Sequence, residues 1–231
     1  MTYIIAGKLK DRTFMMVDAI ITNEKTRKKT FRNKLVKLDS SYETYYSMSG
    51  IAFIDNCIRV YDDWLSQNNK ENDFITGEES IKRLIKIIDK MLASCPVKVK
   101  LNSNKIFFIN KESVVYYKLI FDKNNKLLGT PKRYKLSTGQ CINSIIDAPI
   151  EKCNFNLENI EMSCEDYLNK MPSKQIPSKE VDFKERFSFI ELAPDKSPIR
   201  NYPNKRFSDF IAECNEIDFD SIDNNNFKWN I

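Results

Sequence analysis

Apolar residues at the start of the chain come in two short runs that are separated by a polar break. The runs cover residues 3–6 and 13–19, and both are rich in residues that favour β-strands. The break has the sequence KLKDR. This pattern predicts two antiparallel strands joined by a turn. A turn centred on Lys10 would place Thr2 opposite Asp18.

The next part of the chain changes from strand periodicity to helix periodicity at the pair Ser49-Gly50. Before this pair the pattern is typical of strands, and after it apolar residues recur every three to four positions. The expected elements are two strands followed by two helices, at residues 34–38, 42–48, 51–67 and 78–94. Thr76 and Glu79 are spaced like a capping box at the start of the second helix. This order predicts helices packed on one face of a sheet.

Strand-forming residues return in the second half of the chain. Strands are expected at residues 97–101, 105–110, 114–122, 127–129, 134–136 and 183–192. The stretch 114–122 is the densest in β-formers and is expected near the centre of a sheet. The basic stretch 23–32 has no apolar period and is predicted to be a loop.

Composition favours a globular protein with one sizeable core, because 42% of the 231 residues are hydrophobic. The net charge of +5 arises from 37 basic and 32 acidic residues, so we expect a mixed surface with little support for a nucleic-acid partner. No apolar run approaches the length of a membrane span, and the cytoplasm is the expected location.

The absence of histidine excludes several kinds of active site. Ser-His-Asp and Cys-His catalysis and histidine-ligated metal sites all need this residue, and the chain has none. The six cysteines show no CxxC spacing, which favours reduced, mostly buried thiols over disulfides or zinc. We therefore expect no metal and no cofactor. A nucleophilic hydrolase would need a Thr, Ser or Cys activated by an amine, and an N-terminal Thr supplies both groups.

Thr2, Asp18 and Lys34, with Ser49-Gly50 between a strand and a helix, resemble the proteasome β-subunit family of N-terminal nucleophile (Ntn) hydrolases. The opening Met-Thr-Tyr is similar to that of the bacterial Anbu-type homologues, in which removal of the initiator Met exposes the Thr. The resemblance extends over roughly the first 150 residues. It implies an α+β fold, a four-layer α/β/β/α sandwich with antiparallel sheets.

The resemblance also implies roles for individual residues. Thr2 would be the nucleophile, Lys34 and Asp18 would support it, and the amide of Gly50 would help bind the oxyanion. Thr138 is the nearest match to a catalytic-site serine of the family, which precedes another helix, here residues 141–146. A plain helix cap by Ser137 or Thr138 explains the same residues.

The likeness to the family ends before the C-terminal third of the chain. No Asp-x-x-Ser-Gly sequence is present, and one short helix is expected at residues 164–170. We divide the chain into a proteasome-like domain, residues 1–192, and a C-terminal extension, residues 193–231. The extension ends in an acidic, aromatic tail. Its composition is compatible with docking on a partner protein, with packing on its own domain or with a disordered end.

Three functions follow from these observations. The first is a threonine peptidase that acts on peptides or unfolded proteins and works as a homo-oligomer, as the resemblance implies. The second is a catalytically inactive subunit that serves assembly or partner binding. The third is a nucleic-acid-binding module, for which the basic run at residues 25–32 is the candidate surface.

Overall fold

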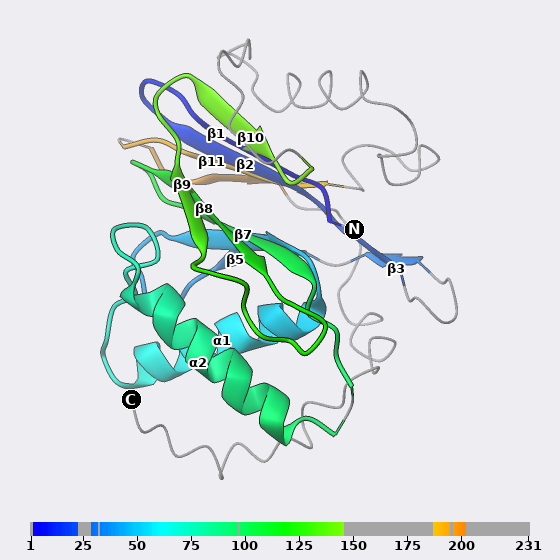
Figure 1. Cartoon of the computed structure of the whole chain (residues 1–231). Helices are drawn as coiled ribbons and strands as arrows, with labels where there is room; N and C mark the ends of the chain where they lie inside the picture. The colour runs from blue at the N-terminus through cyan, green and yellow to red at the C-terminus, as the bar shows by residue number, and fades with distance from the viewer. Residues whose placement is uncertain are drawn as a thin grey trace.

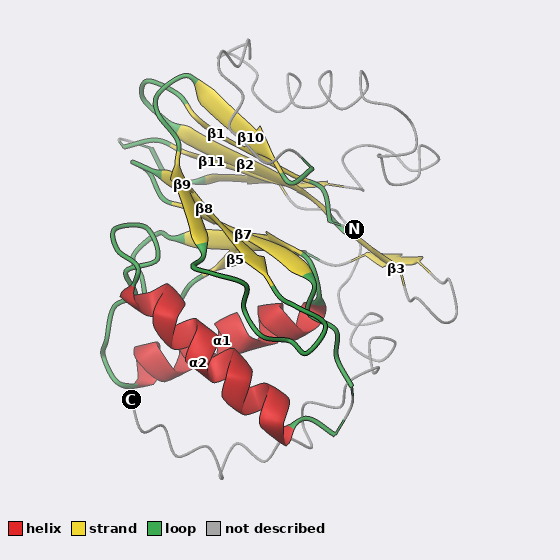
Figure 2. Cartoon of the chain, in the orientation of Figure 1, coloured by secondary structure: helices red, strands yellow, loops and turns green. Residues whose placement is uncertain are grey.

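The computed structural model describes residues 2–22, 29–31, 33–96, 98–145, 187–194 and 196–201. Within this part of the chain, two five-stranded antiparallel sheets face each other, and two helices cover the far side of one sheet (Figure 1; Figure 2). The prediction of an α+β protein with antiparallel sheets is therefore confirmed for the described residues.

The first sheet contains the predicted N-terminal hairpin. Its strands, in spatial order, are β10 (Gln140–Asn143), β1 (Ile4–Lys8), β2 (Thr13–Asp18), β11 (Phe187–Leu192) and β12 (Ile199–Asn201). The predicted register is wrong by one residue, because Tyr3 and not Thr2 lies opposite Asp18. The amide N–H of Leu9 donates to the carbonyl of Arg12 at 2.8 Å, which closes a two-residue turn instead of a turn centred on Lys10.

The second sheet is built from the strands that flank the two helices in sequence. Its spatial order is β5 (Val36–Lys37), β6 (Tyr45–Ser49), β7 (Ser103–Ile109), β8 (Val114–Ile120) and β9 (Lys132–Lys135). The dense run of β-formers forms β8, an interior strand, and β7 occupies the centre. Residues 98–102 form no strand, contrary to the prediction for 97–101. Asn102 has a φ of 47°, a left-handed conformation that turns the chain just before β7.

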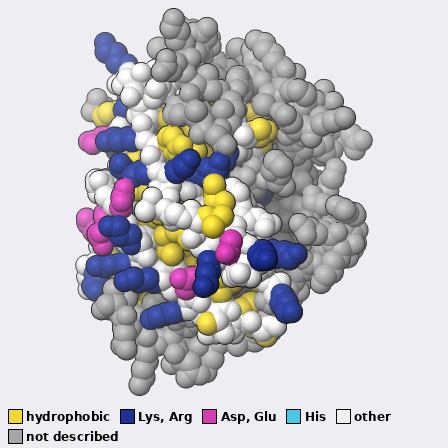
Figure 3. Space-filling view, viewed as in Figure 1, with side chains coloured by type: hydrophobic (Ala, Val, Ile, Leu, Met, Phe, Trp, Pro, Cys, Tyr) yellow, Lys and Arg dark blue, Asp and Glu magenta, His cyan; other side chains and the backbone are white. Residues whose placement is uncertain are grey.

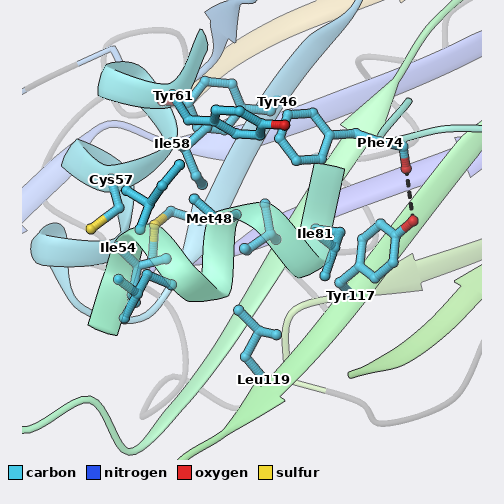
Figure 4. Close-up of a cluster of buried hydrophobic side chains, with 14 of the residues drawn as sticks. Tyr46, Met48, Ile54, Cys57, Ile58, Tyr61, Phe74, Ile81, Tyr117 and Leu119 are labelled. Atoms are coloured by element: carbon cyan, nitrogen blue, oxygen red, sulfur yellow. Dashed lines mark hydrogen bonds between the residues drawn. The ribbon is translucent and has the colours of Figure 1, made fainter. Parts of the chain in front are cut away.

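The helices α1 (Ala52–Gln67) and α2 (Glu79–Ser94) form one layer on the second sheet, as predicted. Their apolar faces and the facing side of the sheet share one buried cluster (Figure 4). In it the rings of Phe74 and Phe108 stack at a centroid distance of 4.3 Å. The predicted capping box at Thr76 is wrong. Instead, the carboxylate of Asp73 accepts the amide N–H of Ser80 at 2.7 Å.

A second apolar cluster fills the space between the two sheets. Strand alternation directs Ile4 and Ala6 of β1 into it, together with Met15 and Val17 of β2. From the second sheet, three aromatic rings lie in register across three strands. Tyr116 stacks on Phe107 at 5.2 Å and on Tyr134 at 4.8 Å between ring centroids. The two sheets are therefore joined mainly by apolar contacts.

The outer face of the first sheet is also apolar and buried. A third cluster there combines Tyr3, Ile5, Phe14 and Met16 with residues from β10 and β11. A sheet that is buried on both faces fits an inner layer of a sandwich. The described residues supply three layers, one of helices and two of sheets. The prediction of a fourth, helical layer concerns residues outside the described part of the chain and stays a prediction.

Two further sequence predictions need correction. The predicted loop at residues 23–32 contains β4 (Lys29–Phe31), which pairs with β3 (Ile20–Thr22) in a small separate sheet. The helix expected at 141–146 is wrong, because β10 occupies its first half and pairs with β1. Pairing with the hairpin provides backbone hydrogen bonds that overrode the local helix signal.

Several other predictions concern the C-terminal half and the cysteines. The helix expected at 164–170 and the acidic tail lie outside the described residues. The predicted extension contains β12, which is hydrogen-bonded to β11, and the domain boundary at residue 192 stays a prediction. Cys141 is disulfide-bonded, so the expectation of reduced thiols is wrong for this residue, whereas Cys57 and Cys95 are free thiols.

On the face seen in Figure 3, basic side chains are interspersed with acidic and apolar ones, in keeping with the mixed surface expected from composition.

Candidate functional site

Thr2, Asp18 and Lys34 lie together at one end of the first sheet. The ammonium of Lys34 donates to Asp18 Oδ2 at 2.9 Å and to Thr2 Oγ1 at 3.4 Å. The other carboxylate oxygen of Asp18 accepts the amide N–H of Tyr3. A largely buried ammonium therefore stands between a carboxylate and a hydroxyl, as the sequence spacing predicted.

Local structure explains how each of the three side chains reaches this point. Thr2 precedes β1 and Asp18 ends β2, so the hairpin brings them to the same end of the sheet. Lys34 is held by its neighbours. The side-chain oxygen of Asn33 accepts the amide N–H of Leu35 at 3.0 Å, an Asx turn around Lys34. Leu35 is buried between the sheets and anchors the segment.

The Asp18 carboxyl is one of the most buried ionisable groups described, with 1% of the residue exposed. Burial raises the pKa of Asp18 above its ordinary value, while the Lys34 ammonium and the Tyr3 N–H act in the opposite direction. A buried carboxylate needs such a partner, because an unpaired charge at this depth is costly. The pair thus keeps a positive charge next to the Thr2 hydroxyl.

Ser144 is a part of the site that the sequence did not predict. Its hydroxyl donates to the carbonyl of Thr2 at 2.9 Å and accepts the amide N–H of Ile4 at 3.1 Å. Its own amide donates to the carbonyl of Ile4 at 2.9 Å. Only the pairing of β10 with β1 could have revealed this contact, because Ser144 is separated from Thr2 by 142 positions.

Lys105 is a second unpredicted residue near Thr2. Its ammonium donates to the carbonyl of Ser144 at 2.8 Å, and only 9% of the residue is exposed. In the sequence, Lys105 begins the run KIFFI, whose other members are all buried. A lysine at the head of such an apolar run is the signal that could have identified it.

Gly50 lies at the junction of β6 and α1, in a conformation that suits glycine. Its φ is 153°, and a Cβ at this position would lie 2.0 Å from Oδ1 of Asn104. That oxygen accepts the amide N–H of Ile51 at 2.9 Å, and the Asn104 amide donates to the carbonyl of Leu101 at 2.6 Å. Asn104, which the sequence also did not predict, therefore fixes the backbone that follows Gly50.

Thr138 does not lie with the other candidate residues, contrary to what the order of elements predicts. It is exposed and lies in the turn before β10, where the next residue, Gly139, donates its amide N–H to the carbonyl of Lys8 at 2.7 Å. Lys8 ends β1 and Thr2 precedes it, so the length of β1 separates the two threonines, about 20 Å at the rise of a strand. At the Thr2 end of β1, the serine hydroxyl that contacts Thr2 is that of Ser144.

No group of three or more acidic, cysteine or histidine side chains is arranged to hold a metal ion in the part of the chain that the structure describes. No helix among the described residues is long and apolar enough to cross a membrane.

Comparison with known proteins gives structural likenesses but no match of the sequence to a family model or curated protein. Among solved structures, the chain is similar to eukaryotic HslV from Trypanosoma brucei, with 12% identity and a TM-score of 0.42. The match covers 83% of this chain and 99% of that one.

Proposed function

We propose that this protein is a threonine peptidase of the proteasome β-subunit type, with Thr2 as its nucleophile after removal of Met1. The observation that carries the proposal is the ammonium of Lys34, which hydrogen-bonds both Thr2 Oγ1 and the buried carboxylate of Asp18. A charge beside a hydroxyl stabilises the alkoxide that forms when the hydroxyl loses its proton. A structural ion pair alone would not need the hydroxyl.

The free α-amine of Thr2 is the proposed general base. An α-amine has a reference pKa of about 7.7 to 8.0, and the neighbouring Lys34 ammonium lowers the pKa by like-charge repulsion. The neutral amine accepts the proton of Oγ1, directly or through a water, as Oγ1 bonds to the substrate carbonyl carbon. The amide N–H of Gly50 is the proposed donor to the oxyanion. Removing a donor of this kind typically costs about 3 to 4 kcal/mol of transition-state stabilisation.

The rest of the cycle needs only Thr2 and water. The protonated amine gives its proton to the leaving nitrogen, the peptide C–N bond breaks, and an acyl ester remains on Thr2. The amine then takes a proton from water as the hydroxide oxygen attacks the ester carbonyl. The bond between the carbonyl carbon and Oγ1 breaks, and the amine returns the proton to Oγ1. The products are a carboxylic acid and the regenerated hydroxyl. The substrates we propose are peptides or unfolded proteins, and the family resemblance further suggests assembly into a homo-oligomer.

Hydrolysis of fluorogenic peptides by the purified full-length chain tests the proposal. Intact-mass measurement should show that Met1 is absent. Thr2→Ala should lower the hydrolysis rate by about a thousandfold or more. Thr138→Ala is the matched control, because Thr138 is exposed at the other end of β1, and it should keep the parent rate.

A chain that retains Met1 and hydrolyses no peptide would overturn the proposal in favour of an inactive subunit. Equal activity of Thr2→Ala and the parent would also overturn it, because another nucleophile would then be responsible.

A further inference from the structure

Lys105 occupies a position where a lysine is costly. It lies near the start of β7, the central strand of the second sheet, and is followed by four buried apolar residues. Burying an ammonium requires hydrogen bonds that replace water. One such bond, to the carbonyl of Ser144 at 2.8 Å, leads away from the second sheet. A charged hydrogen bond to a residue outside the sheet indicates a role for Lys105 other than packing within the sheet.

The bond from Lys105 crosses between the two sheets. Ser144 directly follows β10 of the first sheet, and it holds the N-terminal segment through three hydrogen bonds. They join its hydroxyl to Thr2 and Ile4 and its amide to Ile4. A continuous path of hydrogen bonds therefore runs from Lys105 in the second sheet, through Ser144, to the backbone of Thr2.

The same part of β7 also holds the segment that contains Gly50. Lys105 pairs with Ser49 in the ladder between β6 and β7, and Asn104 accepts the amide N–H of Ile51. Two consecutive residues of one strand thus contact both halves of the site. The half with Thr2 belongs to the first sheet, and the half with Gly50 to the second.

We propose that Lys105 is a positioning residue that, through Ser144, sets the Thr2 hydroxyl at its working distance from the Gly50 amide. The inference rests on the proposed function, because it assigns these two groups to one reaction. A second hydrogen bond between the sheets, from the Thr13 hydroxyl to the carbonyl of Asn110 at 2.6 Å, lies at the opposite end of β2 from Asp18. Between these two ends the sheets pack through a cluster of apolar side chains, whose contacts are not directional. A charged hydrogen bond is directional and stronger than a neutral one, so it can fix the relative position of the two sheets at this end.

A positioning role predicts a specific kinetic pattern. Misplacing the nucleophile weakens transition-state geometry more than substrate binding, so kcat falls while KM changes little. Lys105→Met keeps the length of the side chain and removes its charge and donors. We expect kcat to fall about 10- to 100-fold with KM within about threefold. Lys105→Arg, which retains a cationic donor, should recover part of the rate.

The matched control is Lys132→Met, which removes an exposed lysine from β9 of the same sheet. This variant should keep the parent kcat and KM. Equal losses in Lys105→Met and Lys132→Met, or an unchanged kcat in Lys105→Met, would overturn the inference. So would a rise in KM alone, because that result would place Lys105 in substrate binding.

Amide hydrogen exchange separates this inference from the proposed function. Lys105→Met should speed exchange in peptides that contain Ile4 and Ser144 at least about fivefold, with no change in peptides from β8 and β9. If the parent hydrolyses no peptide but exchange changes in this way, the proposed function fails and the positioning contact stands. Unchanged exchange at both segments would overturn the positioning role whether or not the parent is active.

If Lys105→Met does not fold, Ser144→Ala interrupts the same path one step later. It removes the hydroxyl that holds Thr2 and leaves the carbonyl that Lys105 contacts. The same fall in kcat and the same faster exchange at Ile4 are expected. If Ser144→Ala kept the kcat and the exchange rates of the parent, the proposed path of hydrogen bonds from Lys105 to Thr2 would be contradicted.

Discussion

Two buried aspartates of this protein are held in different ways. Asp18 and Asp62 are 1% and 6% exposed. Asp62, on α1, accepts hydrogen bonds from the amide of Asp39 at 2.8 Å and from the amide of Ser40 at 3.0 Å, and a third from the Ser40 hydroxyl. Asp18 accepts one amide N–H, from Tyr3, and the ammonium of Lys34.

The two carboxylates differ in the chemistry that their hydrogen-bond partners allow. The groups that donate to Asp62 come from one turn, at Asp39 and Ser40, and they hold that turn against the helix layer. The main partner of Asp18 is a cation that also contacts a hydroxyl. Neutral amides stabilise a buried charge without activating anything, whereas a shared ammonium can stabilise a second, developing negative charge. Burial alone therefore does not distinguish a structural carboxylate from a functional one.

Replacing Lys34 should have the largest effect. Lys34→Met leaves Asp18 buried without its cation, which should lower the free energy of unfolding by about 3 to 5 kcal/mol. Hydrolysis per folded molecule should fall by about 100-fold or more, because the alkoxide loses its neighbouring charge. Rates and denaturant unfolding curves check both numbers, with Lys37→Met, an exposed lysine of β5, as control. A parent-like hydrolysis rate would remove the distinction between the two aspartates.

Replacing Asp62 should affect stability alone. Asp62→Ala leaves the amides of Asp39 and Ser40 without their hydrogen-bond acceptor, which should lower the free energy of unfolding by about 2 to 4 kcal/mol. Hydrolysis per folded molecule should stay within about threefold of the parent. Denaturant unfolding and rates at a temperature where both proteins are folded provide the measurement. A selective loss of kcat would mean that the Asp62 turn also supports the site.

Gly50→Ala should have an intermediate effect and has a matched control. The new Cβ would lie 2.0 Å from Asn104 Oδ1, so the backbone or Asn104 must shift, at a cost of about 1 to 3 kcal/mol. Hydrolysis should fall about tenfold or more if the Gly50 amide binds the oxyanion. Gly129 also has a positive φ, 73°, but a Cβ added there would meet no atom within 4 Å. Gly129→Ala therefore introduces backbone strain without a steric clash. Equal rates in both variants would exclude the oxyanion role.

Asp73 extends the comparison to a partly buried carboxylate and should give the smallest effect. Asp73→Ala removes a cap of α2, which should lower the free energy of unfolding by about 1 kcal/mol. Although burial acts to raise the pKa of Asp73, hydrogen bonds from Ser80 and Glu79 outweigh it and lower the pKa below 3.8. The stabilisation should therefore be present above pH 3.8 and disappear as pH falls through the folded-state pKa. Unfolding curves of parent and variant across this range give the difference. If the difference in the free energy of unfolding between the two proteins grew on acidification, the capping role of Asp73 would be contradicted.

Local signals in the sequence predicted the parts of the fold that short-range patterns determine. The periodicity of residues 51–67 and 78–94 gave both helices to within one residue. The spacing of Thr2, Asp18 and Lys34 predicted their proximity although the strand register was wrong by one residue. Their convergence survived because the lysine side chain is long enough to span such a shift.

The remaining parts of the site depend on strand register, which short-range patterns do not encode. The contact of Ser144 with Thr2 requires β10 to pair with β1, and residues 141–146 were expected to be a helix. The order of elements alone predicts Thr138 as a site residue, and the same pairing puts it at the end of β1 far from Thr2. Lys105 reaches Ser144 only when the two sheets are stacked. Each of these contacts joins segments far apart in sequence.

The most direct test of the central claim is to locate the covalent bonds formed by a peptide epoxyketone. Its ketone reacts with a hydroxyl and its epoxide with a nearby amine, so a stable cyclic adduct needs both groups on one residue. Tandem mass spectrometry of the labelled chain should find Met1 absent and both new bonds on Thr2, with no label on Thr2→Ala. An intact Met1 with no adduct, or an adduct at another residue, would contradict the account.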